Sequence, residues 1–166
     1  MESYTERLKR LAGDDEPVAV LAATPDRIRE MIAGLSQDVL QRSPQPGKWS
    51  IAEILAHLAD GEIVFAHRLR MILTASPSPL TAFDQNQWAE LFDYASADAE
   101  ASLEVFAAVR AANVRLVRRV PEALLQRIGR HEEWGSETAA SLLRIEAGHD
   151  RNHLVQIEAI VRGMST

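Results

Sequence analysis

The sequence contains no cysteine. This absence excludes disulfide bonds, thiolate metal ligands and a cysteine nucleophile. Long apolar runs are missing as well, since no stretch approaches the ~20 apolar residues that span a bilayer. The polar N-terminus also lacks the apolar segment of a signal peptide. We therefore expect a cytoplasmic protein with no membrane partner.

Concentrated positive charge is also missing. The 166 residues have a formal net charge of −6, and Arg, Asp and Glu are interspersed without a long run of one sign. We expect no nucleic-acid partner, because binding phosphates requires a concentrated basic patch. The length and an apolar content of 46% predict one domain, residues 1–166, with a core of its own.

Glycine and proline are sparse, with 8 and 7 copies, and they separate long segments of helical period. No segment shows the alternation of a convincing strand, so the sequence predicts an all-α protein. Four long helices with two substantial connections indicate a four-helix bundle. The expected helices follow a short amphipathic one at 3–12, and they span about 17–35, 50–73, 98–120 and 137–162.

The clearest helix start is at Ser50. Ser50 and Glu53 form a capping box, in which the hydroxyl and the carboxylate each accept a hydrogen bond from an end N–H group. Trp49 comes directly before this cap and can pack onto Ile54. Thr24, followed by proline, is interpreted as another cap, which makes residues 17–35 either one kinked helix or two. Ser136 is expected to cap the last helix.

Two histidines, His149 and His153, lie one turn apart on the last predicted helix, with Cβ atoms roughly 5–6 Å from each other. At ~100° per residue they fall on its inward stripe, together with Glu146 and Gln156. An unpaired buried polar group costs about 1–3 kcal/mol. Four adjacent polar side chains therefore indicate a water-filled pocket or a bound ligand.

His57 is the expected third partner of this pair. It lies at the border of the apolar seam of its helix, and Gly61, one turn further on, leaves room beside it for a ligand. His67 falls on the opposite face, and His131 lies in a connector beside two glutamates, so we expect both on the surface. Three neutral imidazoles with an open position form a catalytic type of metal site.

Two other metal sites deserve comparison. His149-Asp150-x-x-His153 is similar to the H-E-x-x-H zinc-protease motif, but the shorter Asp would misplace the general base and no third ligand follows. Glu146-x-x-His149 supplies one Glu-x-x-His element of a di-iron bundle, but the chain has no second copy. The three-histidine site is therefore favoured.

Residues 48–58, KWSIAEILAHL, and residues 149–157, HDRNHLVQI, resemble the DinB-like superfamily. The resemblance implies a four-helix bundle with up-up-down-down order, often dimeric, in which three histidines hold a divalent metal. By position these are His57, His149 and His153, which agrees with the triad derived from periodicity.

The resemblance also implies a function, because characterised members are transferases or isomerases that use mycothiol, bacillithiol or glutathione. The leading hypothesis is a metal-dependent transferase, in which the metal lowers the pKa of a low-molecular-weight thiol. Glu146 or Asp150 could orient an imidazole or accept a proton, although Asp150 also fits an ordinary surface position. The pocket candidates are Gly61, Gln156 and Trp49.

Two functions of other classes remain open: a metal-dependent hydrolase that uses water at the same site, and a non-catalytic, stress-related protein that binds a metal or a small molecule. Three imidazoles suit zinc or nickel, with iron and copper as further candidates. We expect a small-molecule substrate and a homodimer.

Overall fold

The computed structural model describes residues 2–164, so residues 1, 165 and 166 of the expected domain lie outside the described part. Four long helices dominate: α2 (Pro17–Ile32), α4 (Ile51–Thr74), α6 (Ala99–Val117) and α7 (Ala139–Met164). The shorter elements are α1 (Tyr4–Ala12), α3 (Gln37–Leu40), β1 (Ser78–Leu80), α5 (Gln85–Leu91), η1 (Tyr94–Ser96), η2 (Glu122–Gln126), β2 (Ile128–His131) and β3 (Gly135–Thr138).

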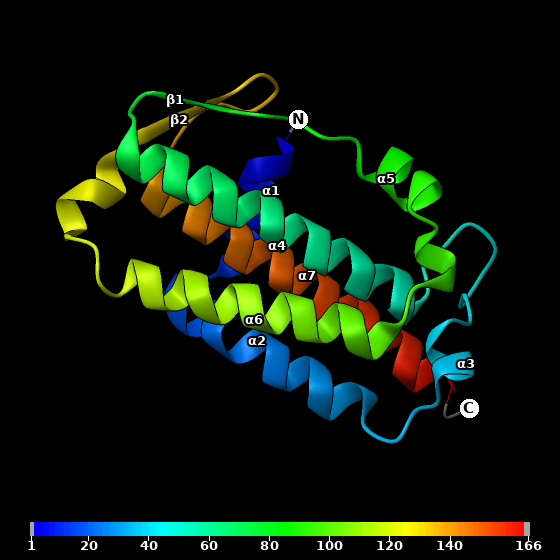
Figure 1. Ribbon diagram of the computed structural model, residues 1–166. Coiled ribbons are helices and arrows are strands. Elements are labelled where there is room, and N and C mark those ends of the chain that lie inside the picture. Colours follow the sequence, from blue (N-terminus) through cyan, green and yellow to red (C-terminus); the bar gives the residue numbers. More distant parts are fainter. Residues whose placement is uncertain (1, 165–166) are drawn as a thin grey trace.

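The long helices form a four-helix bundle, as expected, in which α4 and α2 each pack against both α6 and α7 (Figure 1). One core cluster contains residues from the N-terminal halves of α4 and α6 and from the C-terminal halves of α2 and α7, so these four helix ends lie at the same end of the bundle. The order of directions is therefore up-down-down-up and differs from the expected up-up-down-down. The reason is the connection 75–98, which runs back along the bundle so that α4 and α6 start at the same end (Figure 1).

The expectation of no strands was wrong. β2 pairs in parallel with β1 and antiparallel with β3, and the sheet packs on the end of α4, where a Cβ at Gly129 would lie 2.8 Å from Ile72 Cδ1. Strands of three or four residues are too short to show a period of two. Ser136 consequently lies in β3, and Thr138 caps α7 by accepting a hydrogen bond from the Ser141 N–H at 3.0 Å.

The start of α4 is confirmed. Ser50 Oγ accepts a hydrogen bond from the Glu53 N–H at 3.2 Å, and the Glu53 carboxylate accepts one from the Ser50 N–H at 2.7 Å. Trp49 packs against the core cluster that contains Ile54.

The interpretation of Thr24 as a cap was wrong, because α2 continues through Pro25. The Thr24 hydroxyl donates to the Val20 carbonyl at 2.9 Å. Pro25 lacks the N–H that would bond to the Leu21 carbonyl, and this carbonyl instead accepts from Arg110 Nη1 at 3.1 Å. A side chain from α6 thus satisfies the acceptor that the proline leaves free.

Helix α1 packs along α7. The contact is closest at Gly148, where an added Cβ would lie only 1.8 Å from the Leu8 carbonyl oxygen. Arg151 of α7 donates to the carbonyls of Leu11 and Ala12 at 3.2 and 2.7 Å. The N-terminal helix is therefore fixed on the segment of α7 that carries the two predicted histidine ligands.

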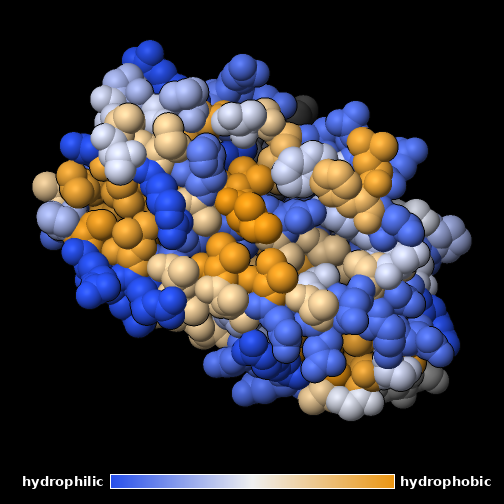
Figure 2. Space-filling model, viewed as in Figure 1, coloured by the Kyte–Doolittle hydropathy of each residue, from blue (hydrophilic) through white to orange (hydrophobic). Residues whose placement is uncertain are grey.

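Hydrophobic side chains form separate clusters among hydrophilic ones on the face seen in Figure 2. Large exposed apolar side chains include Ile63 of α4 and Val105 of α6, on neighbouring helices. The homodimer stays a prediction, which light scattering would check. None of the helices within residues 2–164 combines the length and the apolar character needed to cross a membrane.

Candidate metal centre

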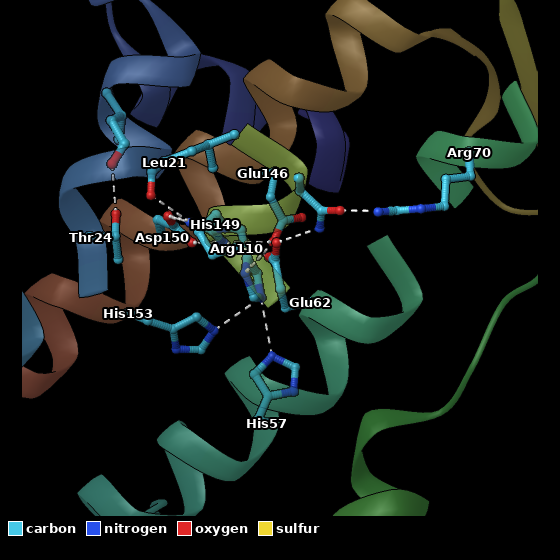
Figure 3. Close-up of polar contacts among 12 residues, drawn as sticks. Leu21, Thr24, His57, Glu62, Arg70, Arg110, Glu146, His149, Asp150 and His153 are labelled. Carbon is cyan, nitrogen blue, oxygen red and sulfur yellow. Dashed lines mark hydrogen bonds and ion pairs between the residues drawn. The ribbon is translucent and has the colours of Figure 1, made fainter. Parts of the chain in front are cut away.

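The structure brings His57 of α4 together with His149 and His153 of α7 (Figure 3). His149 Nε2 lies 3.1 Å from His57 Nε2 and 3.1 Å from His153 Nε2. Zinc–nitrogen bonds of roughly 2.0–2.1 Å in a tetrahedron place ligand nitrogens about 3.3 Å apart. The two distances at His149 are close to this value, and the ligand nitrogens of all three histidines lie within 4.8 Å of one another, so one divalent ion could bridge them.

All three imidazoles are held in the neutral form. Burial, together with the charge of His153, lowers the pKa of His57 to about 3, and burial, together with His149, lowers the pKa of His153 to about 3. Burial and the charge of His57 also lower the pKa of His149 well below its usual value. A neutral imidazole keeps one nitrogen lone pair, so the triad has the protonation state that metal binding requires.

One neighbour fixes the tautomer of His153. Gln156 Oε1 accepts a hydrogen bond from His153 Nδ1 at 2.7 Å, so Nε2 carries the lone pair. His57 packs against Trp49, with the ring centroids 5.1 Å apart. The buried Nδ1 atoms of His57 and His149 have no hydrogen-bond partner among the described residues. This donor set fits a divalent metal with nitrogen ligands.

A buried ion network that the sequence analysis missed lies behind the triad (Figure 3). Arg110 of α6 donates to both oxygens of Asp150, at 2.5 and 3.0 Å, and pairs with Glu62 Oε2 at 2.8 Å. Glu146 Oε1 lies 3.6 Å from the same guanidinium. The surface interpretation of Asp150 was therefore wrong, and because Arg110 binds both its oxygens, it cannot be the base of a zinc-protease motif.

Burial controls the charges in this network. It raises the pKa of Glu62, although Arg110 and Asn113 oppose the shift, and it raises the pKa of Glu146, which Glu62 raises further. Burial alone would lower the pKa of Arg110, but Asp150 and Glu62 outweigh it and raise that pKa above its usual value. The guanidinium therefore stays charged and links α4, α6 and α7 beside the triad.

Two pockets meet at His149. One, of about 470 Å³, contains Gly61 in its wall, and the other, of about 590 Å³, contains Trp49 and Gln156. The first is lined by Ser3, Tyr4, Thr5, Leu8, His57, Gly61, Phe65, Arg68, Phe83, Gln85, Glu133, Trp134, Leu142, Ile145, Glu146 and His149. The second is lined by Tyr4, Arg7, Pro44, Gly47, Lys48, Trp49, Ile54, Gln85, Asn86, His149, Asn152, His153, Gln156, Ala159 and Ile160. The predicted pocket residues thus fall on both sides of the triad.

The two remaining histidines differ from each other. His67 is exposed, as expected. The surface interpretation of His131 was wrong: this side chain is buried and stacks on Trp134, with the ring centroids 3.8 Å apart and the planes 8° apart. The β2–β3 turn, which no sequence signal revealed, brings Trp134 over it.

A four-helix bundle with three converging neutral histidines defines the class: helical proteins with a candidate divalent-metal site between two of their long helices. The model of the DinB superfamily matches residues 21–157, and the chain belongs to this superfamily.

Similar proteins include "Putative metal-dependent hydrolase OB0782" of Oceanobacillus iheyensis, which is 27% identical over 83% of this chain and 80% of its own length. "Putative metal-dependent hydrolase YfiT" of Bacillus subtilis is 22% identical over 90% of this chain and 85% of its own length. The solved structure of YfiT, described as "a probable metal-dependent hydrolase with an unusual four-helix bundle topology", matches with a TM-score of 0.83 over 90% of this chain and 86% of that one. This likeness supports the fold.

Proposed function

We propose that the protein is a metal-dependent hydrolase whose divalent ion is held by the Nε2 atoms of His57, His149 and His153. The observation that carries the proposal is the convergence of three neutral imidazoles, with His149 Nε2 at 3.1 Å from each of the other two, where two pockets meet. The names of the relatives, metal-dependent hydrolases, support the reaction class.

A divalent ion, when bound, supplies Lewis acidity toward a carbonyl oxygen or a water molecule. The protein side chains position the ligands and transfer the proton. Gln156 keeps His153 in the required tautomer. Glu146 lies in the pocket wall with Oε1 3.9 Å from His149 Nδ1, so it is the candidate to accept a proton from the attacking water. Asp150 is bound by Arg110 and holds α7 in place.

The test starts from protein purified without a histidine tag. Elemental analysis should find one divalent ion per chain, and the zinc- or nickel-loaded protein should hydrolyse 4-nitrophenyl acetate. His153→Ala should lose both the ion and the turnover, whereas His67→Ala, a matched change at an exposed histidine of α4, should keep both. Equal metal content in His153→Ala and the wild type would refute the triad. Stoichiometric metal without hydrolysis of any ester or amide would refute the reaction class.

A metal-dependent thiol transferase is the second candidate, and one observation favours it. A transferase needs room for two substrates at one centre, and two pockets of about 470 and 590 Å³ meet at His149. Incubation with glutathione or bacillithiol and chlorodinitrobenzene would show metal-dependent loss of the thiol. Metal binding with neither hydrolysis nor thiol loss would favour a non-catalytic binding protein.

A further inference from the structure

Arg68 is a buried cation in the wall of the pocket of about 470 Å³, which Glu133 and Glu146 also line. No carboxylate of the described residues lies within ion-pair distance of its guanidinium. Only 7% of the residue is exposed. Its Nη2 donates to the Thr81 carbonyl and lies 3.4 Å from His131 Nε2, and both groups are neutral. The buried Nε has no hydrogen-bond partner within the part of the chain that the structure describes.

The other buried arginine near the site, Arg110, also has a buried Nε without a hydrogen-bond partner among the described residues, but it differs in its ion pairs. Arg110 is 1% exposed, and the carboxylates of Asp150 and Glu62 lie 2.5 and 2.8 Å from its guanidinium. Burying a charge without a counter-charge is expensive, and proteins usually pair buried charges. Glu146 of the same pocket attracts Arg68 electrostatically, but its carboxylate lies beside Arg110, and no carboxylate of the described residues forms an ion pair with Arg68. This difference from Arg110 indicates that a ligand supplies the close counter-charge of Arg68.

The location of Arg68 relates this ligand to the candidate metal centre. His57 and Arg68 are eleven residues apart on α4, which brings them to the same helix face with Cα atoms about 16 Å apart along the axis. Gly61 lies between them, and an added Cβ there would have no atom within 4 Å. Space is therefore open beside α4 at Gly61, and the same pocket extends past Phe65 to Arg68.

Apolar and polar side chains share the walls of this pocket, and the polar ones include Gln85, Glu133 and Glu146. The apolar part of the lining comes from Phe65 of α4, Leu142 and Ile145 of α7, and Leu8 of α1. The rings of Trp134 and Phe83 lie 5.2 and 5.8 Å from Arg68 Cζ, so they shield the charge from bulk water. The pocket thus combines two of the triad histidines, a set of apolar side chains and the cation of Arg68.

We propose that the substrates are esters or amides of dicarboxylic acids, an inference that rests on the proposed function. The free carboxylate of such a substrate binds Arg68 while the scissile carbonyl lies at the histidine triad. A chain of methylene groups joins the two groups of such a substrate. In the reaction, the oxygen of water bonds to the carbonyl carbon and the bond from that carbon to the leaving group breaks. The products are a dicarboxylate, an alcohol or amine, and a proton.

The experiment uses zinc-loaded protein and compares two substrates that differ at one end, where one has a free carboxylate and the other its neutral methyl ester: mono-4-nitrophenyl suberate and methyl 4-nitrophenyl suberate. Arg68→Met should raise KM for the monoester about 10- to 100-fold, because a charge-assisted hydrogen bond is lost, and should leave the diester within about two-fold. Arg68→Lys should recover part of the difference. Arg29→Met, a matched change at an exposed, distant arginine, should alter neither substrate. Equal effects of Arg68→Met on both esters would overturn the proposal.

A binding measurement keeps this inference separate from the proposed function. Calorimetry with octanoate, which has no hydrolysable bond, on metal-free wild type and on Arg68→Met requires no turnover. Binding to the wild type that weakens at least ten-fold in Arg68→Met would support the carboxylate site even if no ester is hydrolysed. Equal binding to both proteins, or no binding to either, would overturn it. Arg68→Gln repeats the comparison if Arg68→Met does not fold.

Discussion

Gly148→Ala should displace α1 and thereby open the pocket beside the candidate metal centre. The new Cβ would lie 1.8 Å from the Leu8 carbonyl oxygen, 2.6 Å from its carbonyl carbon and 3.1 Å from its Cα. All three atoms belong to backbone, which cannot rotate away as a side chain could. Ordinary van der Waals contact begins near 3.4 Å, so α1 must recede from α7 by roughly 1.5 Å.

The cost follows from what α1 buries and how it is attached. Leu8 is 1% exposed, and complete loss of its burial would cost about 1.5–3 kcal/mol. Arg151 binds the end of α1, so the helix cannot recede without strain or broken hydrogen bonds. The higher helix propensity of alanine compared with glycine offsets this loss of stability by up to about 1 kcal/mol. We therefore expect the free energy of unfolding to fall by about 1–3 kcal/mol.

Urea unfolding measures this change, and trypsin cleavage after Lys9 or Arg10 reports whether α1 has loosened. Gly61→Ala is the matched control, because it is also a glycine inside a long helix but has open space around the added Cβ. It should raise the free energy of unfolding by about 0.5–1 kcal/mol. If Gly148→Ala stabilised the protein by the same amount and left the cleavage rate unchanged, the close contact with α1 would be refuted.

Three other predictions concern the side chains around the triad. Gln156→Leu should weaken metal affinity about 10- to 100-fold, measured by competition with a chelating dye, because His153 loses its Nδ1 acceptor. In metal-free protein His57 and His153 have pKa values of about 3, below the value of about 6.5 in the unfolded chain. Urea unfolding should therefore show stability lost as pH falls below 6.5, by up to about 1.4 kcal/mol per pH unit for each of them. Arg110→Met should destabilise by about 3–5 kcal/mol, since it leaves buried carboxylates unpaired, whereas Arg68→Met should cost less than about 2 kcal/mol in the same assay.

The parts of the fold that the sequence predicted correctly depend on local signals. Ser50 and Glu53 are three residues apart, and their capping box forms within one helical turn. His149 and His153 are one turn apart, so periodicity alone places them on one face. His57 could then be predicted as the third ligand, because it lies at the border of the apolar seam of another long helix and can face that pair across the bundle.

The parts that the sequence did not predict depend on partners far apart in the chain. β1 pairs with β2 through Ser78 opposite Gly129, and neither strand is long enough to show its period. His131 lies beside two glutamates in sequence, which indicated a surface position. Its burial depends on Trp134 and Arg68, and only the folded hairpin brings these together.

The ion network did leave a signal in the sequence. The network also explains why the three histidines can come together. On α4, Glu62 occupies the buried position between Leu58 and Phe65 where the helical period calls for an apolar residue. Arg110 and Asp150 are the corresponding buried charges of α6 and α7. Each of the three helices thus contributes one charged residue to this network, and the three charges meet. Sliding one helix by a turn, about 5.4 Å, would leave a buried charge unpaired. The network therefore fixes the register of α4 against α7, which is what brings His57 opposite the histidine pair.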